Sequence, residues 1–128
     1  MAGLAKTIGN GAATNSFTEI GTHSNCIMMI GSNPENGHPI VAMHVQRALN
    51  RGAKLIVIDP VKTEFANRAD IHLQLEPEHN IPVINALIHA IIDENLVNQE
   101  FVEKYTKGFE YVKEAVKDYS PEAVAKYT

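Results

Sequence analysis

The side chains best suited to ligand chemistry gather in three polar segments, and each of them directly follows an apolar stretch. Short hydroxyl, amide and carboxylate side chains bind the phosphate, ribose and base groups of nucleotides. The segments are Gly31, Ser32, Asn33, Pro34, Glu35, Asn36, Gly37 and His38; then Asp59, Pro60, Val61, Lys62 and Thr63; then Glu76, Pro77, Glu78, His79 and Asn80. We therefore treat them as three candidate contacts with one nucleotide-like ligand.

The first segment, residues 31–38, has the composition of a phosphate site. Gly31 lets the backbone approach a ligand closely, and Ser32 and Asn33 supply short hydrogen-bonding side chains. A helix predicted to begin near Pro39 points unpaired N–H groups at the segment, where they would stabilise a phosphate. The alternative is a well-capped turn between a strand and a helix. The segment has neither G-x-G-x-x-G nor the Gly-Lys-Ser/Thr of a P-loop, which weakens a simple dinucleotide or triphosphate site.

The other two segments also have structural alternatives. Asp59 ends a predicted strand, where open α/β folds bind ribose hydroxyls, but it could equally cap the turn at residues 63–67. Residues 76–80 could contact the edge of the ligand. Alternatively, Asn80 could cap the long helix that follows, which by itself explains this asparagine. The residue pattern leaves both questions open.

No catalytic or metal-binding centre emerges from the remaining reactive side chains. His44 and His89 fall on predicted helices, His72 on a predicted strand and His23 in a turn, without the spacing of a metal site. The single Cys26 excludes an internal disulfide, and its place in an apolar run predicts an inert buried thiol. We expect neither a catalytic residue nor a metal ligand in this chain.

Three predicted strands position the three segments. Residues 26–30 and 55–58 are continuous apolar runs, typical of parallel strands that are buried on both faces. Residues 71–75 alternate between apolar and polar side chains, as a third strand would. A helix is predicted between the first two strands, from Pro39 to an end marked by Gly52.

The remainder of the chain is predicted to be helical. A long helix begins at Asn80 and ends near Asn95, and residues 98–105, 108–118 and 120–127 form shorter surface helices. The long helix has an apolar face made of Ile84, Leu87, Ile88, Ile91 and Ile92. The order strand, helix, strand, strand, helix predicts a right-handed βαβ unit in an open, mainly parallel sheet. We expect one three-layer, Rossmann-like α/β domain with flanking helices, spanning residues 1–128.

Composition narrows the class of partner. The 128 residues carry a net charge of −4 and only 11 scattered Lys and Arg, which argues against nucleic-acid binding. The apolar stretches are too short for a membrane span, and the N-terminus does not read as a secretory signal, so the cytoplasm is the expected compartment. Both ends of the chain look cut, which predicts a segment of a longer polypeptide.

Motifs along nearly the whole chain carry a resemblance to a known family. They are Gly3–Ala12, Ile30–Pro34 with His38-Pro39, Ala53–Pro60, Ala69-Asp70, Asn85–Leu87 with His89, and Thr106–Phe109. In this order and spacing the sequence resembles the molybdopterin oxidoreductases, and within them the formate dehydrogenase subfamily. The resemblance implies a parent enzyme that oxidises formate to carbon dioxide. Nitrate reductase or another molybdopterin enzyme, a stand-alone nucleotide-binding module and a purely structural domain are the alternatives.

The resemblance also implies a cofactor, bis(molybdopterin guanine dinucleotide) with molybdenum or tungsten. By position, residues 31–37 would contact its pyrophosphate and nucleoside, and residues 59–63 would follow as a second contact with Asp59 on the ribose. Glu78, His79 and Asn80 would lie near the guanine. The polar N-terminal stretch would approach the pterin and the metal.

Two departures from the family pattern concern binding. Val61 stands where many relatives have Arg, so the bidentate contact is lost unless Lys62 replaces it, and Asn80 stands where relatives often have Asp. The metal-ligating Cys or selenocysteine would precede Ala2, and the iron–sulfur cysteines would lie earlier still. The chain alone should therefore be inactive. Its implied partners are the other domains of the parent, with electron-transfer subunits as further candidates and no direct membrane contact.

Overall fold

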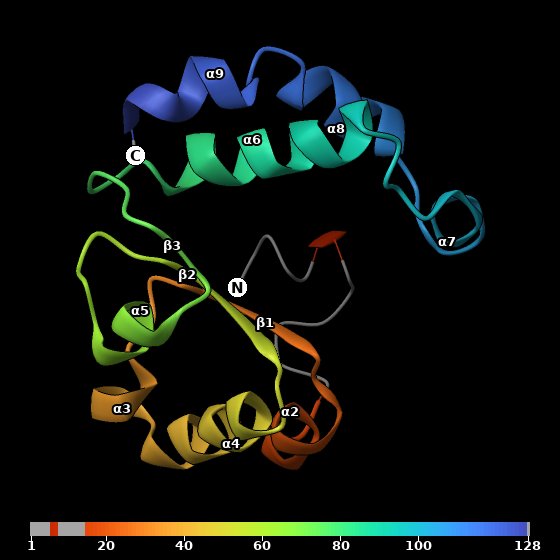
Figure 1. The fold of residues 1–128 in the computed structure, drawn as a ribbon. Helices are drawn as coiled ribbons and strands as arrows, with labels where there is room; N and C mark the ends of the chain where they lie inside the picture. The colour runs from red at the N-terminus through yellow and green to blue at the C-terminus, as the bar shows by residue number, and fades with distance from the viewer. Residues whose placement is uncertain (1–5, 8–14, 128) are drawn as a thin grey trace. The chain divides into compact units, whose positions relative to one another are not determined.

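The computed structural model describes residues 6–7 and 15–127, which fall into two compact units, residues 1–72 and 73–128 (Figure 1). The first unit comprises α2 (Phe17–His23), β1 (Cys26–Ile30), α3 (Pro34–Gly37), α4 (Pro39–Asn50), β2 (Lys54–Ile58) and α5 (Glu64–Arg68), followed by β3 (Ile71–Leu73) at the boundary. The second comprises α6 (Asn80–Asp93), α7 (Gln99–Tyr105), α8 (Phe109–Val116), α9 (Pro121–Val124) and η1 (Ala125–Tyr127). Most of the stretch 3–12 that carries the resemblance lies outside the described residues. The expectation of a single domain stays a prediction.

The sheet confirms the predicted α/β class. Its strand order is β1-β2-β3, and β1 and β2 pair in parallel from Cys26 opposite Lys54 to Ile30 opposite Ile58. α4 connects these two strands, so β1, α4 and β2 form the predicted βαβ unit. In the part of the chain that the structure describes, no helix has the length and apolar character needed to cross a membrane.

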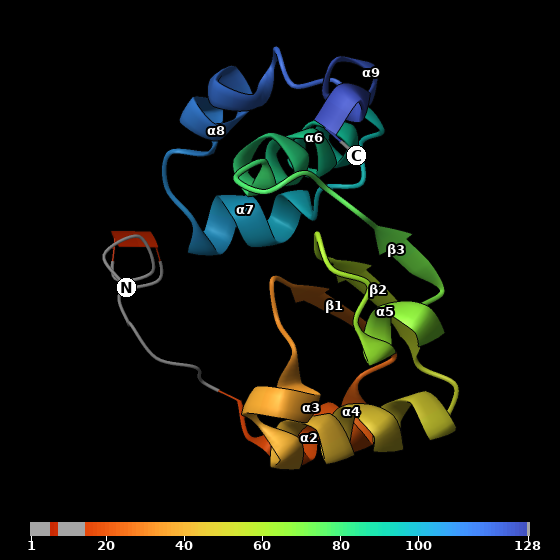
Figure 2. The same cartoon turned by 90° about the vertical axis from the view of Figure 1, so that its left-hand side faces the viewer.

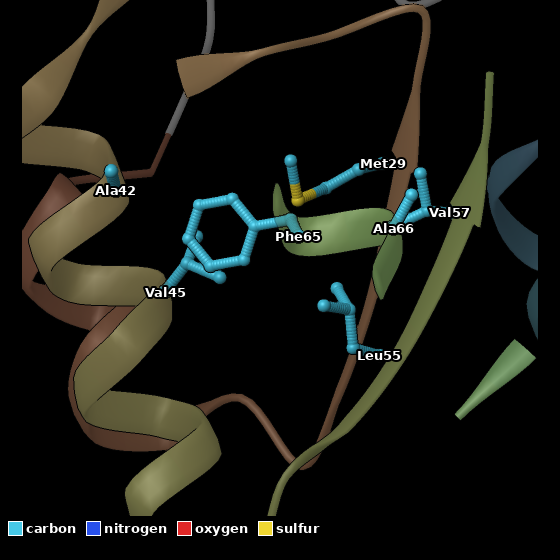
Figure 3. Packing of buried hydrophobic residues seen from close by; sticks show 7 residues of the cluster. All are labelled: Met29, Ala42, Val45, Leu55, Val57, Phe65 and Ala66. Carbon is cyan, nitrogen blue, oxygen red and sulfur yellow. The ribbon is translucent and has the colours of Figure 1, made fainter. Parts of the chain in front are cut away.

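The core of the first unit lies between one face of the sheet and α4. Its buried residues are Met29, Ala42, Val45, Leu55, Val57, Phe65 and Ala66. Phe65 projects from α5 toward Val45, and Met29, Leu55 and Val57 approach it from the strands (Figure 3). Figure 2 shows α2 and α4 together on this side of β1 and β2.

The opposite face of β1 is open in this unit, which overturns two predictions. Met28 is 54% exposed and Cys26 is exposed, whereas Met29 is only 7% exposed. The prediction that β1 is buried on both faces is therefore wrong here, and so is the prediction that Cys26 is a buried thiol. The physical reason is that α2, α4 and α5 all pack against the same core.

α2 is fixed to α4 at a close crossing. Ser16 begins α2 with a capping box, in which Glu19 Oε2 accepts the Ser16 N–H at 2.7 Å. At the other end of α2, the Arg51 guanidinium donates to the carbonyls of Gly21 and Ser24. These bonds satisfy carbonyls that a helix end otherwise leaves unpaired. His44 is buried against the crossing, and its Nδ1 has no hydrogen-bond partner among the described residues.

Replacing Gly21 by valine should loosen this crossing. A Cβ at Gly21 would lie 2.9 Å from His44 Nδ1 and 3.3 Å from the His44 carbonyl oxygen. Overpacking of this kind lowers the free energy of unfolding by about 1–3 kcal/mol, which urea titration would measure. Gly37→Val is the control, because nothing lies within 4 Å of a Cβ there. Equal losses in both variants would contradict a steric role for Gly21.

Two helix ends match their predicted positions because each has the backbone geometry that its terminal residue favours. Gly52 has φ +95° after α4, and Asn95 has φ +57° after α6. After α4, the N–H groups of Gly52 and Ala53 bond to Leu49 and Ala48 at 2.9 and 3.1 Å. The same double pattern, a Schellman motif, follows α6.

A carboxylate fastens β3 to β2 at the amino end of the sheet. Asp70 accepts from Lys54 Nζ at 2.6 Å and from the Leu55 N–H at 2.8 Å. Its own N–H donates to the Leu55 carbonyl at 2.9 Å. The hydrogen bond from Lys54, and then that from the Leu55 N–H, lower the pKa of Asp70.

This lowered pKa predicts an acid-sensitive contribution to stability. The ionised Asp70 stabilises the fold above its ordinary pKa of 3.8, and the contribution is lost as pH falls through the lowered value. Asp70→Asn should therefore be less stable than the unmodified chain near neutral pH, and the gap should close between about pH 4 and pH 2. Unfolding followed by circular dichroism across this range would measure it. A gap that widens on acidification would contradict the assignment.

α6 departs from prediction in its start and its packing. His79 is the N-cap residue, without a side-chain cap bond, and Asn80 is the first helical residue, so the predicted capping role of Asn80 is wrong. Val83 and Ala86 are the buried residues of α6, whereas Ile91 is 46% exposed. Ile84, Leu87, Ile88 and Ile92 are only partly buried. The buried face differs from the predicted one because α6 packs against α8 and α9.

A candidate cofactor site at the ends of two parallel strands

The first two polar segments begin side by side. Ile30 and Ile58 are register partners at the carboxyl ends of β1 and β2, and the Gly31 N–H donates to the Ile58 carbonyl at 2.9 Å. Both loops therefore leave the sheet at one end, where open parallel sheets bind their ligands. The structure brings together residues 31–38 and 59–63, as predicted.

Residues 31–38 form a folded loop with open space at its start. Gly31 has φ +54°, and nothing lies within 4 Å of a Cβ built there. The predicted loop contains one helical turn, α3, in which the Gly37 N–H donates to the Asn33 carbonyl at 3.1 Å. Proline at the first position of α3 fits this turn, because Pro34 has no N–H to satisfy. The backbone therefore shapes the loop without help from its polar side chains.

Those polar side chains are available to a ligand. Ser32, Asn33 and His38 are exposed, and within the described residues none of them makes a side-chain hydrogen bond. The structure does not support the alternative of a well-capped turn here, because Asn33 and His38 occupy N-cap positions without capping. α4 begins directly after His38, and its first N–H groups add donors for an anion.

The second loop is built differently, because its polar side chains also hold the loop. Asp59 is 8% exposed, and its Oδ1 accepts the Val61 N–H at 2.8 Å. Thr63 caps α5 by accepting the Ala66 N–H at 3.2 Å. The structural alternative is thus correct for Thr63 and partly correct for Asp59. Lys62 is exposed and forms no ion pair within the described residues.

His72 supports this loop, and sequence reasoning missed it. Its Nε2 lies 3.0 Å from the Asp59 carbonyl oxygen, so β3 holds the end of β2 through a side chain. The usable signal was its position, because a polar residue in the strand adjacent to β2 can reach the β2 terminus. We interpret His72 as a positioning residue.

The third loop belongs to the second unit, and its place in a shared site stays a prediction. The ring of His79 stacks on Tyr127, with centroids 4.2 Å apart, and its Nδ1 lies 3.0 Å from the Pro77 carbonyl oxygen. The Glu76 N–H donates to the Tyr127 carbonyl at 2.9 Å. Glu78 has φ +70°, which is unusual for a residue with a side chain. Asn80 is exposed.

Comparison with known proteins decides the family. Residues 3–121 match the family model for molybdopterin oxidoreductase. The chain belongs to the molybdopterin oxidoreductase family. The predicted resemblance is thereby confirmed.

Three relatives illustrate the similarity. The F420-dependent formate dehydrogenase subunit alpha of Methanocaldococcus jannaschii is 45% identical over 98% of this chain and 19% of its own length. Formate dehydrogenase H of Escherichia coli is 44% identical over the whole chain and 18% of its own length. The structure of acetylene hydratase from Pelobacter acetylenicus superimposes with a TM-score of 0.77 at 35% identity, covering 88% of this chain and 17% of that one.

The alternative of a nitrate reductase is a weaker match. The assimilatory nitrate reductase catalytic subunit of Bacillus subtilis is 35% identical over 79% of this chain. The chain spans less than a fifth of the length of the two formate dehydrogenases. Members of the family therefore contain further domains beyond the part represented here.

The described residues fit the organic part of a molybdopterin cofactor, which family membership implies together with a metal. The open space at Gly31 and the unengaged side chains of Ser32 and Asn33 would accommodate polar ligand atoms. Within the described residues, no group of three or more His, Cys, Asp or Glu side chains could hold a metal ion.

Proposed function

We propose that this chain is the part of a molybdenum- or tungsten-dependent formate dehydrogenase catalytic subunit that binds the guanine dinucleotide of its cofactor. The observation that carries the proposal is the 44–45% identity to two formate dehydrogenases over 98% or more of the chain. The nitrate reductase and acetylene hydratase matches are both at 35%. The parent would oxidise formate to carbon dioxide.

In this proposal the first loop holds the pyrophosphate. Residues 31–37 surround it, with Ser32 and Asn33 donating from their side chains and α4 donating from its first backbone N–H groups. His38 lies at the entrance to α4 and adds a further donor. The pyrophosphate is anionic, so donors at a helix N-terminus stabilise it.

The second and third loops would contact the nucleoside. Asp59 Oδ1 is engaged with Val61, which leaves Oδ2 for a ribose hydroxyl. Pro60, Val61, Lys62 and Thr63 line the same turn, and Lys62 supplies the positive charge that Val61 does not. Glu78, His79 and Asn80 would lie near the guanine. The stack of His79 on Tyr127 makes backbone groups and Asn80 the better contacts of that loop.

The bound cofactor, bis(molybdopterin guanine dinucleotide), supplies the redox chemistry through its metal. This chain binds and orients the guanine dinucleotide, which is the protein's usual share of the work in cofactor enzymes. The metal-ligating Cys or selenocysteine and the iron–sulfur cysteines would come from other parts of the parent. Electron-transfer subunits would be its partners.

Activity of the parent tests the proposal. The purified parent should reduce an artificial viologen acceptor in a formate-dependent manner, and it should neither reduce nitrate nor hydrate acetylene. The identity of the reaction decides between the three relatives. Nitrate reduction in the absence of formate turnover would replace the proposal with the nitrate reductase alternative.

The chain by itself should bind guanine nucleotides weakly. Two loops offer few hydrogen bonds, and the ordering cost of association is large, so we expect a GDP dissociation constant of about 1 mM or weaker. Isothermal titration calorimetry would measure it, with ADP as the control nucleotide. Micromolar GDP binding would instead favour a stand-alone nucleotide-binding module.

A further inference from the structure

β1 is a sheet edge that lacks the usual protection against further pairing. The strand order places β1 at one edge, with β2 as its neighbour. Its sequence, Cys-Ile-Met-Met-Ile, contains no charged residue and no proline. Natural edge strands are normally interrupted by lysine, proline or a bulge, because an exposed edge is a template for another strand. β1 has the composition of an interior strand.

The backbone of β1 leaves alternate residues without a partner. The Asn25 carbonyl accepts from the Lys54 N–H, and the Gly31 N–H donates to the Ile58 carbonyl, so odd-numbered residues face β2. Backbone groups alternate in direction along a strand. The outward-facing residues are therefore Cys26, Met28 and Ile30, and no hydrogen bond reaches their outer side from the described residues.

An apolar groove of about 300 Å³ runs along this edge. Cys26 and Met28 line it from one face of the strand, Ile27 and Met29 from the other, and Val45 lies on α4. Because residues of both faces line one groove, the groove must follow the outer edge of β1. Ser32 and His38 of the first loop lie at its end, so the groove reaches the candidate site.

We propose that β1 is completed by a parallel strand from the part of the parent polypeptide that follows residue 128. This inference rests on the proposed function only in requiring a longer parent, as the 18–19% coverage of the relatives indicates. The added strand would make β1 interior and place the first loop at a topological switch point. Ligands bind at such points, so the strand would form the second wall of the cofactor site.

Two features favour a parallel strand of the parent over a second copy of this chain. β1 and β2 pair in parallel, and strands added to such sheets by crossover connections are parallel too. A two-fold dimer would pair β1 with its copy in the antiparallel direction. The order β3-β2-β1 is also the first half of a doubly wound sheet, whose next strand returns beside β1.

Hydrogen exchange resolved to single residues tests the proposal. In this chain the amides of Met28 and Ile30 should exchange freely, while those of Ile27 and Met29 are protected by β2. In the parent, isolated without its cofactor, the Met28 and Ile30 amides should slow roughly 100-fold or more because they join a new ladder. Fast exchange in the parent would overturn the proposal. Slow exchange in this chain that depends on its concentration would indicate a second copy instead.

A pair of matched variants separates strand pairing from general destabilisation. Met28→Lys and Met43→Lys make the same change at 54% and 49% exposed positions, one on β1 and one on α4. In the parent, Met28→Lys should speed Ile30 exchange about tenfold or more, and Met43→Lys should not. The melting temperature of this chain should change little in either variant. Equal exchange in both parent variants would overturn the proposal, whether or not the parent oxidises formate.

Discussion

Phe65→Ala is expected to unfold the first unit at a much lower urea concentration than the unmodified chain requires. Phe65 is 1% exposed and fills the space between α4 and the strands (Figure 3). Truncation of a buried phenylalanine costs about 3–5 kcal/mol, because transfer free energy is lost and a cavity remains. That is a large share of the stability of a domain this size. Urea titration followed by circular dichroism would measure the loss.

Phe101→Ala is the matched control for this experiment. Phe101 makes the same change at a position that is 54% exposed on α7, where its ring contacts only Tyr105 among the described aromatic residues. Its loss should stay below about 1 kcal/mol. If both variants lost the same stability, the core of the first unit would not centre on Phe65.

Asp59→Asn in the parent should lower cofactor content without unfolding the domain. Asparagine keeps an oxygen that accepts the Val61 N–H, which preserves the turn, but it removes the charge proposed to bind the ribose. Hydrogen bonds to charged groups contribute about 1.5–3 kcal/mol, so occupancy should fall roughly tenfold or more under limiting cofactor. Molybdenum or tungsten per chain, and guanine nucleotide released by acid, would measure it.

Two further variants show which property of Asp59 matters. Asp59→Ala removes both the charge and the turn, so it should lower cofactor content and also stability. Asp70→Asn changes a carboxylate at the opposite end of the sheet, where it pairs with Lys54, and should leave cofactor content unchanged. Full cofactor content in Asp59→Asn would remove Asp59 from the proposed site.

Features fixed by local chemistry were predictable from the sequence. Ser16 and Ser120 accept bonds from residues three positions ahead, as N-cap residues do, and Asn98 does the same at α7. Gly52 and Asn95 end their helices because each adopts a positive φ. The first two loops were predictable too, because parallel strands deliver their carboxyl ends to one edge.

Features that depend on a partner were not predictable. An apolar run reports that β1 is suited to burial, but not what covers it, and Met28 and Cys26 are exposed as a result. The apolar face of α6 has the same ambiguity, since Val83 and Ala86 rather than Ile91 are buried. Asp59 shows a third limit. One carboxylate can hold a turn and still contact a ligand, so its two interpretations do not exclude each other.

Tyr127 sets a practical boundary for anyone who shortens this domain for recombinant work. Its carbonyl accepts the Glu76 N–H, and its ring covers His79, so residues near the chain end brace a loop about 50 positions earlier. A version that ends at Val124 would remove this brace from the loop that carries Glu78 and Asn80. Such a version could keep its helices and still present a loop with a different shape, which would make nucleotide-binding measurements on it misleading.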